Sequence, residues 1–329
     1  MLIVMGVLKL GRLIKFIPYP VIAGFTSGIA VMILMGQLNE FLGLNLKMPE
    51  HVPQQIKALV GNLAATQWQT VIIGVVTLAT LYGWPRITKK IPASIVAVVL
   101  ATVLAQMLGW HVSTIGTKFG GIPSGWPGWH MPEVSLDAMR DLMVPAFTIA
   151  MLGAIESLLS AMVADGMTDT RHDSNQELIG QGIANVLTPL VGGIAATGAI
   201  ARTAANIRSG ARSPISGIVH ALVLLVVALF GGPLAQHIPL ACLSGILITV
   251  ALRMGDWDTF REIWRGPKSD FMVLITAFLL TVIFDLTAGV GVGLVMAAVL
   301  FVKRMEEITN IHLVTPETET EPSGGHSIV

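Results

Sequence analysis

Long apolar runs separated by short polar segments dominate the pattern along this chain. A helix needs about 20 apolar residues to cross the hydrocarbon core of a bilayer, with a range of roughly 17 to 25. The apolar runs, which hold few charged residues, predict nine full spans, in chain order 20–38, 68–85, 92–109, 142–164, 176–195, 214–230, 238–253, 270–285 and 287–304. We therefore expect an all-α polytopic membrane protein.

Two further apolar segments are too short to span a bilayer. Residues 1–10 have about half the required length, and the positive charges follow this run, whereas a secretory signal carries them before it. We interpret this segment as the end of a truncated span, so that the chain is a fragment of a longer protein. Residues 197–209 follow the helix-breaking pair Gly192-Gly193 and predict a half-helix.

The distribution of Lys and Arg predicts the orientation, because cytoplasmic loops carry an excess of both. If the spans alternate, one side collects most of these residues: Lys9, Arg12, Lys15, Arg86, Lys89, Lys90, Arg171, Arg208, Arg212, Arg253, Arg261, Arg265, Lys268, Lys303 and Arg304. The split requires 197–209 to count as a crossing element. It places the C-terminus in the cytoplasm, where residues 305–329 read as a solvated linker.

The amino-acid composition agrees with a membrane protein and excludes several other classes of protein. Hydrophobic residues make up 53% of the 329 residues and charged residues 12%, against about 25% charged in a typical soluble domain. The zero net charge gives no basic footprint for nucleic acid, and the single Cys242 excludes a disulfide framework. Because no hydrolase, zinc-protease or Walker motif is present, we expect no enzyme, cofactor or metal site.

Glu156 is the first candidate for chemistry, near the middle of the span 142–164. A carboxylate there costs about 2.5 to 3.5 kcal/mol on insertion scales, so such residues face a cavity, pair or become protonated. Ser160 lies one helical turn further and shares the same helix face. The alternative interpretation is a Glu that only hydrogen-bonds a neighbouring helix. Asp285 lies between two spans, and we expect it to cap the following helix rather than to take part in transport.

Arg202 is the second candidate, one turn into the predicted half-helix. A helix that begins near Thr197, Gly198 or Ala199 directs free N–H groups and the positive end of its dipole into the protein. Broken transporter helices use this arrangement for anionic substrates. Glu156 would pair with Arg202 when no anion is bound, and a purely structural pair is the alternative. Gly24 and Gly28 fit the small-xxx-small pattern of close helix contacts.

Several motifs resemble one transporter family. Residues 17–30, from Ile17-Pro18-Tyr19-Pro20 to Ala30, resemble the fifth-span signature of the SulP anion transporters, the sulfate permease family. The segments 153–165, 178–185 and 198–210 match the family further. The resemblance covers residues 1 to about 315 and looks closest to bacterial DauA-like dicarboxylate and sulfate permeases.

The resemblance implies two inverted seven-span repeats, with a core domain that moves against a gate domain and a STAS domain that is missing here. The implied parts are the end of a truncated span and a cytoplasmic loop (1–19), gate spans of the first repeat (20–109), an extracellular loop (110–141), core spans of the second repeat (142–230), gate spans of the second repeat (231–304) and the linker (305–329).

For the substrate site, the resemblance implies the residues Glu156, Ser160, Thr197, Gly198, Ala199, Ile200 and Arg202. In sodium-coupled bicarbonate members the position of Glu156 is an Asp that binds the ion, with a hydroxyl at the position of Ile200. Because Ile200 offers no hydroxyl, the sequence favours a proton, carried by Glu156, as the coupling ion.

We therefore expect secondary active transport of a small dicarboxylate or sulfate anion, coupled to protons, by alternating access. The alternatives are sodium-coupled bicarbonate uptake and a non-transporting, anion-sensitive membrane protein. Nucleobase carriers share the architecture, but the context of Arg202 favours an anion. The remaining expectations are contact with membrane lipid, a homodimer in the full-length protein and a place in the bacterial inner membrane.

Overall fold

The computed structural model describes most of the chain. It covers residues 1–11, 19–49, 51–88, 90–121, 128–129, 131, 135–255, 257–265, 268–284, 292, 295–296 and 299. Asp285 and the linker 305–329 lie outside these residues. The same holds for the expected span 287–304, apart from four residues in it.

Within the described residues the fold is helical and contains no β-strand; Thr114 and Pro239 form one isolated bridge. The elements are α1 (Leu2–Val7), α3 (Tyr19–Leu42), α4 (Val52–Gly61), η1 (Leu63–Ala65), α5 (Trp68–Ile87), α6 (Ala93–Met107), α7 (Ile115–Phe119), α8 (Leu136–Thr168), α9 (Ser174–Leu187), η2 (Thr188–Val191), α10 (Ile200–Arg208), α11 (Ile215–Phe230), α12 (Gly232–Ala235), α13 (Leu240–Met254), α14 (Trp257–Trp264) and α15 (Lys268–Ile283). The all-α fold class is confirmed.

Among the described residues, α3, α5 and α8 are long and apolar enough to cross a membrane, and so is the stretch Leu240–Trp264, in which α13 and α14 lie. Shorter apolar helices at Ala93–Met107, Ile215–Phe230 and Asp270–Ile283 coincide with three more of the expected spans. The chain therefore has the helices of an integral multi-pass membrane protein.

The expected span 176–195 is wrong in its second half. Helix α9 ends at Leu187 and a 3₁₀ turn, η2, follows it up to a left-handed Gly192 with φ of 73°. Pro189, inside that turn, has no N–H for an α-helical hydrogen bond. The sequence pattern also missed α4, and it placed 136–141 in a loop although α8 already begins at Leu136.

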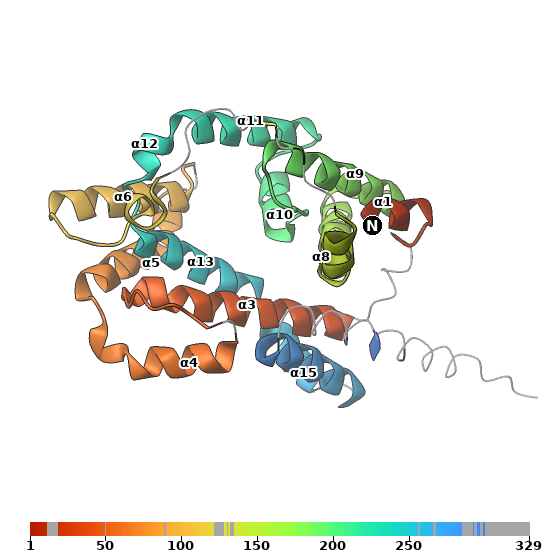
Figure 1. Cartoon of the computed structure of the whole chain (residues 1–329), viewed down its shortest axis with the longest axis horizontal. Coiled ribbons are helices and arrows are strands. Elements are labelled where there is room, and N and C mark those ends of the chain that lie inside the picture. Colours follow the sequence, from red (N-terminus) through yellow and green to blue (C-terminus); the bar gives the residue numbers. More distant parts are fainter. Residues whose placement is uncertain are drawn as a thin grey trace, which may run out of the picture.

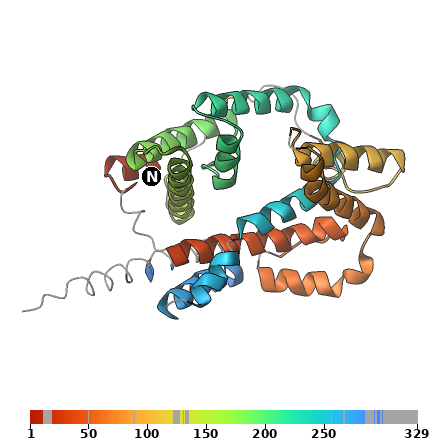
Figure 2. The ribbon, with the colours of Figure 1, turned by 180° about the vertical axis from the view of Figure 1, so that it is seen from behind.

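One group of helices, which we call the α3 bundle, consists of α3, α5, α6, α13 and α15. Helix α3 packs against α13 and α15, and α5 packs against α6 and α13, as both views show (Figure 1, Figure 2). A Cβ at Gly24 would overlap the backbone of Leu274, and one at Gly28 would lie 2.7 Å from Thr281 Cβ. The small-xxx-small prediction for Gly24 and Gly28 is therefore confirmed.

The second group, which we call the α8 bundle, consists of α1, α8, α9 and α10 (Figure 1). Ala154 and Leu158 of α8 are buried against Leu178 of α9 and Leu2 of α1. The two bundles touch where Phe25 of α3 packs on Met151 of α8.

Helix α11 runs between the α8 bundle and α12 (Figure 1) and has no buried residue. Most of its large apolar side chains, such as Leu222 and Val226, are more than half exposed. A helix that is apolar all round and not covered by protein is suited to contact with lipid.

Candidate functional site

Glu156 lies on α8 with its side chain partly buried. Among the described residues its carboxyl group has no hydrogen-bond or ion-pair partner, and Arg202 is exposed on the first turn of α10. The structure thus forms no ion pair between Glu156 and Arg202, contrary to expectation for the anion-free protein. Glu156 precedes Ser157, which is the first of two α8 hydroxyls that contact the polypeptide around α10.

The chain between η2 and α10 carries no helix over residues 193–199. Hydrogen bonds that involve side chains fix this segment to α8 and α9. Asn185 Nδ2 donates to the carbonyl of Ala196 at 2.8 Å, and the Ala196 N–H donates to Asn185 Oδ1 at 2.8 Å. The Thr197 hydroxyl donates to the Gly153 carbonyl at 2.9 Å, and the Gly198 N–H donates to Ser157 Oγ at 3.2 Å.

Helix α10 is the short helix that the sequence predicted, although its first helical residue is Ile200. The Thr203 N–H donates to the carbonyl of Ala199, which therefore occupies the N-cap position. The N–H groups of the first turn lack intrahelical acceptors by the geometry of an α-helix, and the helix dipole adds partial positive charge there. Arg202 brings a full positive charge to the same turn.

Helix α8 holds α10 through hydroxyl groups. Ser160 Oγ lies 2.7 Å from Thr203 Oγ1, and Ser157 Oγ lies 2.7 Å from Thr197 Oγ1. Both serines are buried, with exposed fractions of 5% and 2%. The start of α10 is thus fixed against the turn of α8 that carries Glu156.

The structure brings most of the predicted site residues together. Ser160 contacts α10, Thr197 and Gly198 contact α8, and Ala199 and Ile200 begin α10. Three further residues, Ser157, Thr203 and Asn185, were not predicted from the sequence. The signal for Ser157 was present, since it lies four residues after Gly153 and three before Ser160, on one helix face.

The arrangement can attract an anion, and nothing in it points to a metal. Free N–H groups, a dipole end and Arg202 supply positive potential beside polar hydroxyls. In the part of the chain that the structure describes, no group of three His, Cys, Asp or Glu side chains could hold a metal ion.

Comparison with solved structures identifies the class of fold. The transmembrane domain of a cyanobacterial bicarbonate transporter, BicA, superimposes with a TM-score of 0.76 at 35% identity, covering 88% of this chain and 72% of that one. SLC26A9 superimposes with a TM-score of 0.80 at 21% identity, covering 92% of this chain and 50% of that one. This is a multi-pass membrane protein with the inverted-repeat transporter fold.

The family follows from sequence comparison. Residues 1–277 match the model of the sulfate permease family, and the chain belongs to that family. It is 44% identical to the putative sulfate transporter YvdB of Bacillus subtilis, over 98% of this chain and 60% of that protein. It is 35% identical to the bicarbonate transporter BicA of Synechocystis, over 93% of this chain and 54% of that protein. The chain thus spans little more than half the length of these relatives, which are named as transporters, not enzymes.

Proposed function

We propose that the gene product carrying this chain is a secondary active transporter that takes up a small anion, a sulfate or a dicarboxylate, together with protons. The observation that carries the proposal is the first turn of α10, which carries the exposed Arg202 and is fixed by hydroxyl bonds to the part of α8 that carries Glu156. The name of YvdB supports sulfate, and the dicarboxylate remains a prediction from the sequence resemblance.

The positive charge at α10 would bind the anion. An anion at this place would accept hydrogen bonds from the backbone of residues 199–202 and pair with the Arg202 guanidinium. Arg202 is available for this role because, among the described residues, it has no carboxylate partner.

Glu156 would couple the anion to protons. A carboxyl group inside a membrane protein with no charged neighbour is more easily accommodated when it is neutral. Protonation of Glu156 on one side and release on the other would let the protein move a proton together with the anion.

The α8 bundle would act as the moving core and the α3 bundle as the gate. This assignment rests on the resemblance to the family and on the packing of the helices into two groups with few contacts between them. We further propose a cytoplasmic C-terminus, a homodimer and a place in the bacterial inner membrane.

Binding and flux measurements on the complete gene product in liposomes test the proposal. Arg202→Gln should weaken sulfate and succinate binding by about tenfold or more, since a charge-assisted bond contributes about 1.5–3 kcal/mol. Arg140→Gln, a charge removal on the exposed start of α8, is the matched control and should leave binding unchanged. Equal affinities for both variants would contradict the role of Arg202.

Glu156→Gln should abolish uptake driven by a proton gradient while anion exchange continues, because Gln cannot take up a proton. The measurement is accumulation of labelled sulfate at several external pH values. If the variant retained the pH dependence of the unmodified protein, Glu156 would not be the coupling group.

Sodium-coupled bicarbonate uptake is the second candidate, favoured by the identity of 35% and 38% to two cyanobacterial proteins named as bicarbonate transporters. The absence of a hydroxyl on Ile200 argues against it. Labelled bicarbonate uptake in sodium and in choline medium separates the two candidates, because only this one requires sodium.

A further inference from the structure

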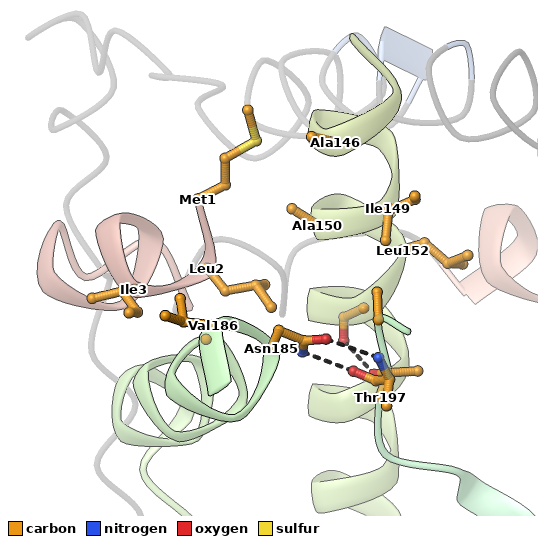
Figure 3. Close-up of a pocket in the computed structure, with 14 residues that line it drawn as sticks. Met1, Leu2, Ile3, Ala146, Ile149, Ala150, Leu152, Asn185, Val186 and Thr197 are labelled. Carbon is orange, nitrogen blue, oxygen red and sulfur yellow. Dashed lines mark hydrogen bonds between the residues drawn. The ribbon is translucent and has the colours of Figure 1, made fainter. Parts of the chain in front are cut away.

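Asn185 contacts the backbone near α10 through both the donor and the acceptor of its side-chain amide. Its amide exchanges two hydrogen bonds with Ala196, both at 2.8 Å, and also donates to the carbonyl of Gln181 at 2.9 Å. Figure 3 shows Asn185 reaching from α9 to the segment that contains Thr197. Asn185 therefore joins α9 to the non-helical segment that leads into α10.

This segment needs such partners because its backbone makes no helix. Unpaired N–H and C=O groups are costly away from water, and in membrane proteins irregular backbone is tolerated only where other groups satisfy it. A carboxamide has both a donor and an acceptor, so one Asn side chain can pair with a residue as a neighbouring β-strand would.

Three consecutive residues are held by hydrogen bonds that involve side chains. The Asn185 amide pairs with the Ala196 backbone, the Thr197 hydroxyl bonds to the Gly153 carbonyl and to the Ser157 hydroxyl, and the Gly198 N–H donates to Ser157 Oγ. Ala199 follows directly as the N-cap of α10. The positions of the free N–H groups of α10 therefore depend on where this segment is fastened.

A cavity of about 420 Å³ borders the Asn185 contact. Apart from the Asn185 amide and Thr197, its lining is mainly apolar, with Leu2, Ile149 and Val186 among the lining residues (Figure 3). If the amide were removed, the Ala196 N–H and C=O would lose both of their side-chain partners at the border of this mainly apolar cavity.

We propose that Asn185 is a positioning residue for the anion site: its amide fixes the Ala196 backbone and thereby places the first turn of α10. The proposal rests on the proposed function, because it assumes that the first turn of α10 binds the anion. Asn185 itself does not touch the anion in this scheme. A binding group that is displaced by about 1 Å can cost up to about a hundredfold in effectiveness, so a small shift at Ala196 suffices.

Two variants and one control test this role in the complete gene product. Asn185→Ala removes both bonds to Ala196, whereas Asn185→Asp keeps the acceptor for the Ala196 N–H. Asn62→Ala is the matched control, since the side chain of Asn62, the C-cap of α4, has within the described residues only a bond to the carbonyl of Ala58 in that helix, at 2.8 Å. The measurements are amide hydrogen exchange at single-residue resolution, sulfate affinity and thermal stability.

In Asn185→Ala we expect the Ala196 amide to exchange about tenfold faster or more, and sulfate affinity to fall by about tenfold or more. In Asn185→Asp the Ala196 amide should keep its protection, which tests the contact even if Asn185→Ala does not fold. Asn62→Ala should leave both quantities within about twofold, as for a surface change away from the site.

The outcomes separate this proposal from the proposed function. If the unmodified protein bound none of sulfate, succinate and bicarbonate, the proposed function would fail, and with it this role. If the unmodified protein bound sulfate and Asn185→Ala bound it equally well, with only a lower thermal stability, Asn185 would be merely structural and the proposed function would stand. Unchanged exchange at Ala196 in Asn185→Ala would also overturn the proposal.

Discussion

Two buried hydroxyls of the α8 bundle have different partners from three buried hydroxyls of the α3 bundle. In the α3 bundle, Thr77, Thr249 and Thr281 each donate to a carbonyl four residues earlier in their own helix, at 2.8 to 3.0 Å. In the α8 bundle, Ser157 and Ser160 bond to residues of a different segment, at 2.7 Å.

The difference shows that the two regions are held together by different forces. The α3 bundle associates by close contact of small residues, as at Gly24 and Gly28, and its hydroxyls contribute little to contacts between helices. The α8 bundle contains non-helical backbone and a short helix, which cannot satisfy their own polar groups, so cross-segment hydrogen bonds are required.

The largest effect is expected where close packing is blocked in the α3 bundle. Gly24→Val should lower stability by about 3 kcal/mol, at the upper end of the cost of overpacking, because the new side chain would meet the backbone of Leu274. Gly36→Val in the same helix is the control, since a Cβ there has no neighbour within 4 Å. Thermal unfolding in detergent measures both, and equal midpoints would contradict the packing argument.

The next largest effect is the difference in stability loss between substitutions of two buried serines. Ser157→Ala should cost about 1–3 kcal/mol, since the Gly198 N–H loses its acceptor, while Ser244→Ala should cost less than about 0.5 kcal/mol. Ser244 is as buried as Ser157, but within the described residues its hydroxyl bonds only to Ala241 of its own helix. The measurement is the free energy of unfolding of each variant. Equal losses in Ser157→Ala and Ser244→Ala would contradict the difference between the two bundles.

A smaller effect is the coupling between Ser160 and Thr203. A double-mutant cycle of Ser160→Ala and Thr203→Val should give an interaction energy of about 0.5–1.5 kcal/mol, the typical net value of one hydrogen bond. A cycle of Ser160→Ala with Thr249→Val should give none, because Thr249 bonds within α13. A coupling near zero in the first cycle would mean that the contact contributes nothing to fastening α10.

The smallest effect is expected for Thr281→Val. Thr281 is fully buried against α3, but in the part of the chain that the structure describes its hydroxyl bonds only to Ala277 of its own helix, whose carbonyl keeps its helical partner. Stability should change by no more than about 0.5 kcal/mol in thermal unfolding. A loss above about 1 kcal/mol would show that hydroxyls support contacts between helices in the α3 bundle too.

Much of the helical framework could be predicted from apolar runs, because the bilayer thickness sets a length that is visible in one dimension. The prediction failed at Leu187, where Pro189 ended the helix inside an apolar run. It also missed α4, which is too short and too polar to resemble a span. These errors arise where local backbone chemistry overrides hydrophobicity.

The sequence by itself determined that Glu156 and Arg202 are costly charges in apolar surroundings and that a short helix begins after Gly192-Gly193. Only the tertiary structure decided that the two charges are not paired, and that Ser157, Thr203 and Asn185 fasten the start of α10. The reason is physical: hydrophobicity is a property of each residue, whereas a hydrogen bond between Asn185 and Ala196 depends on how the chain turns in three dimensions.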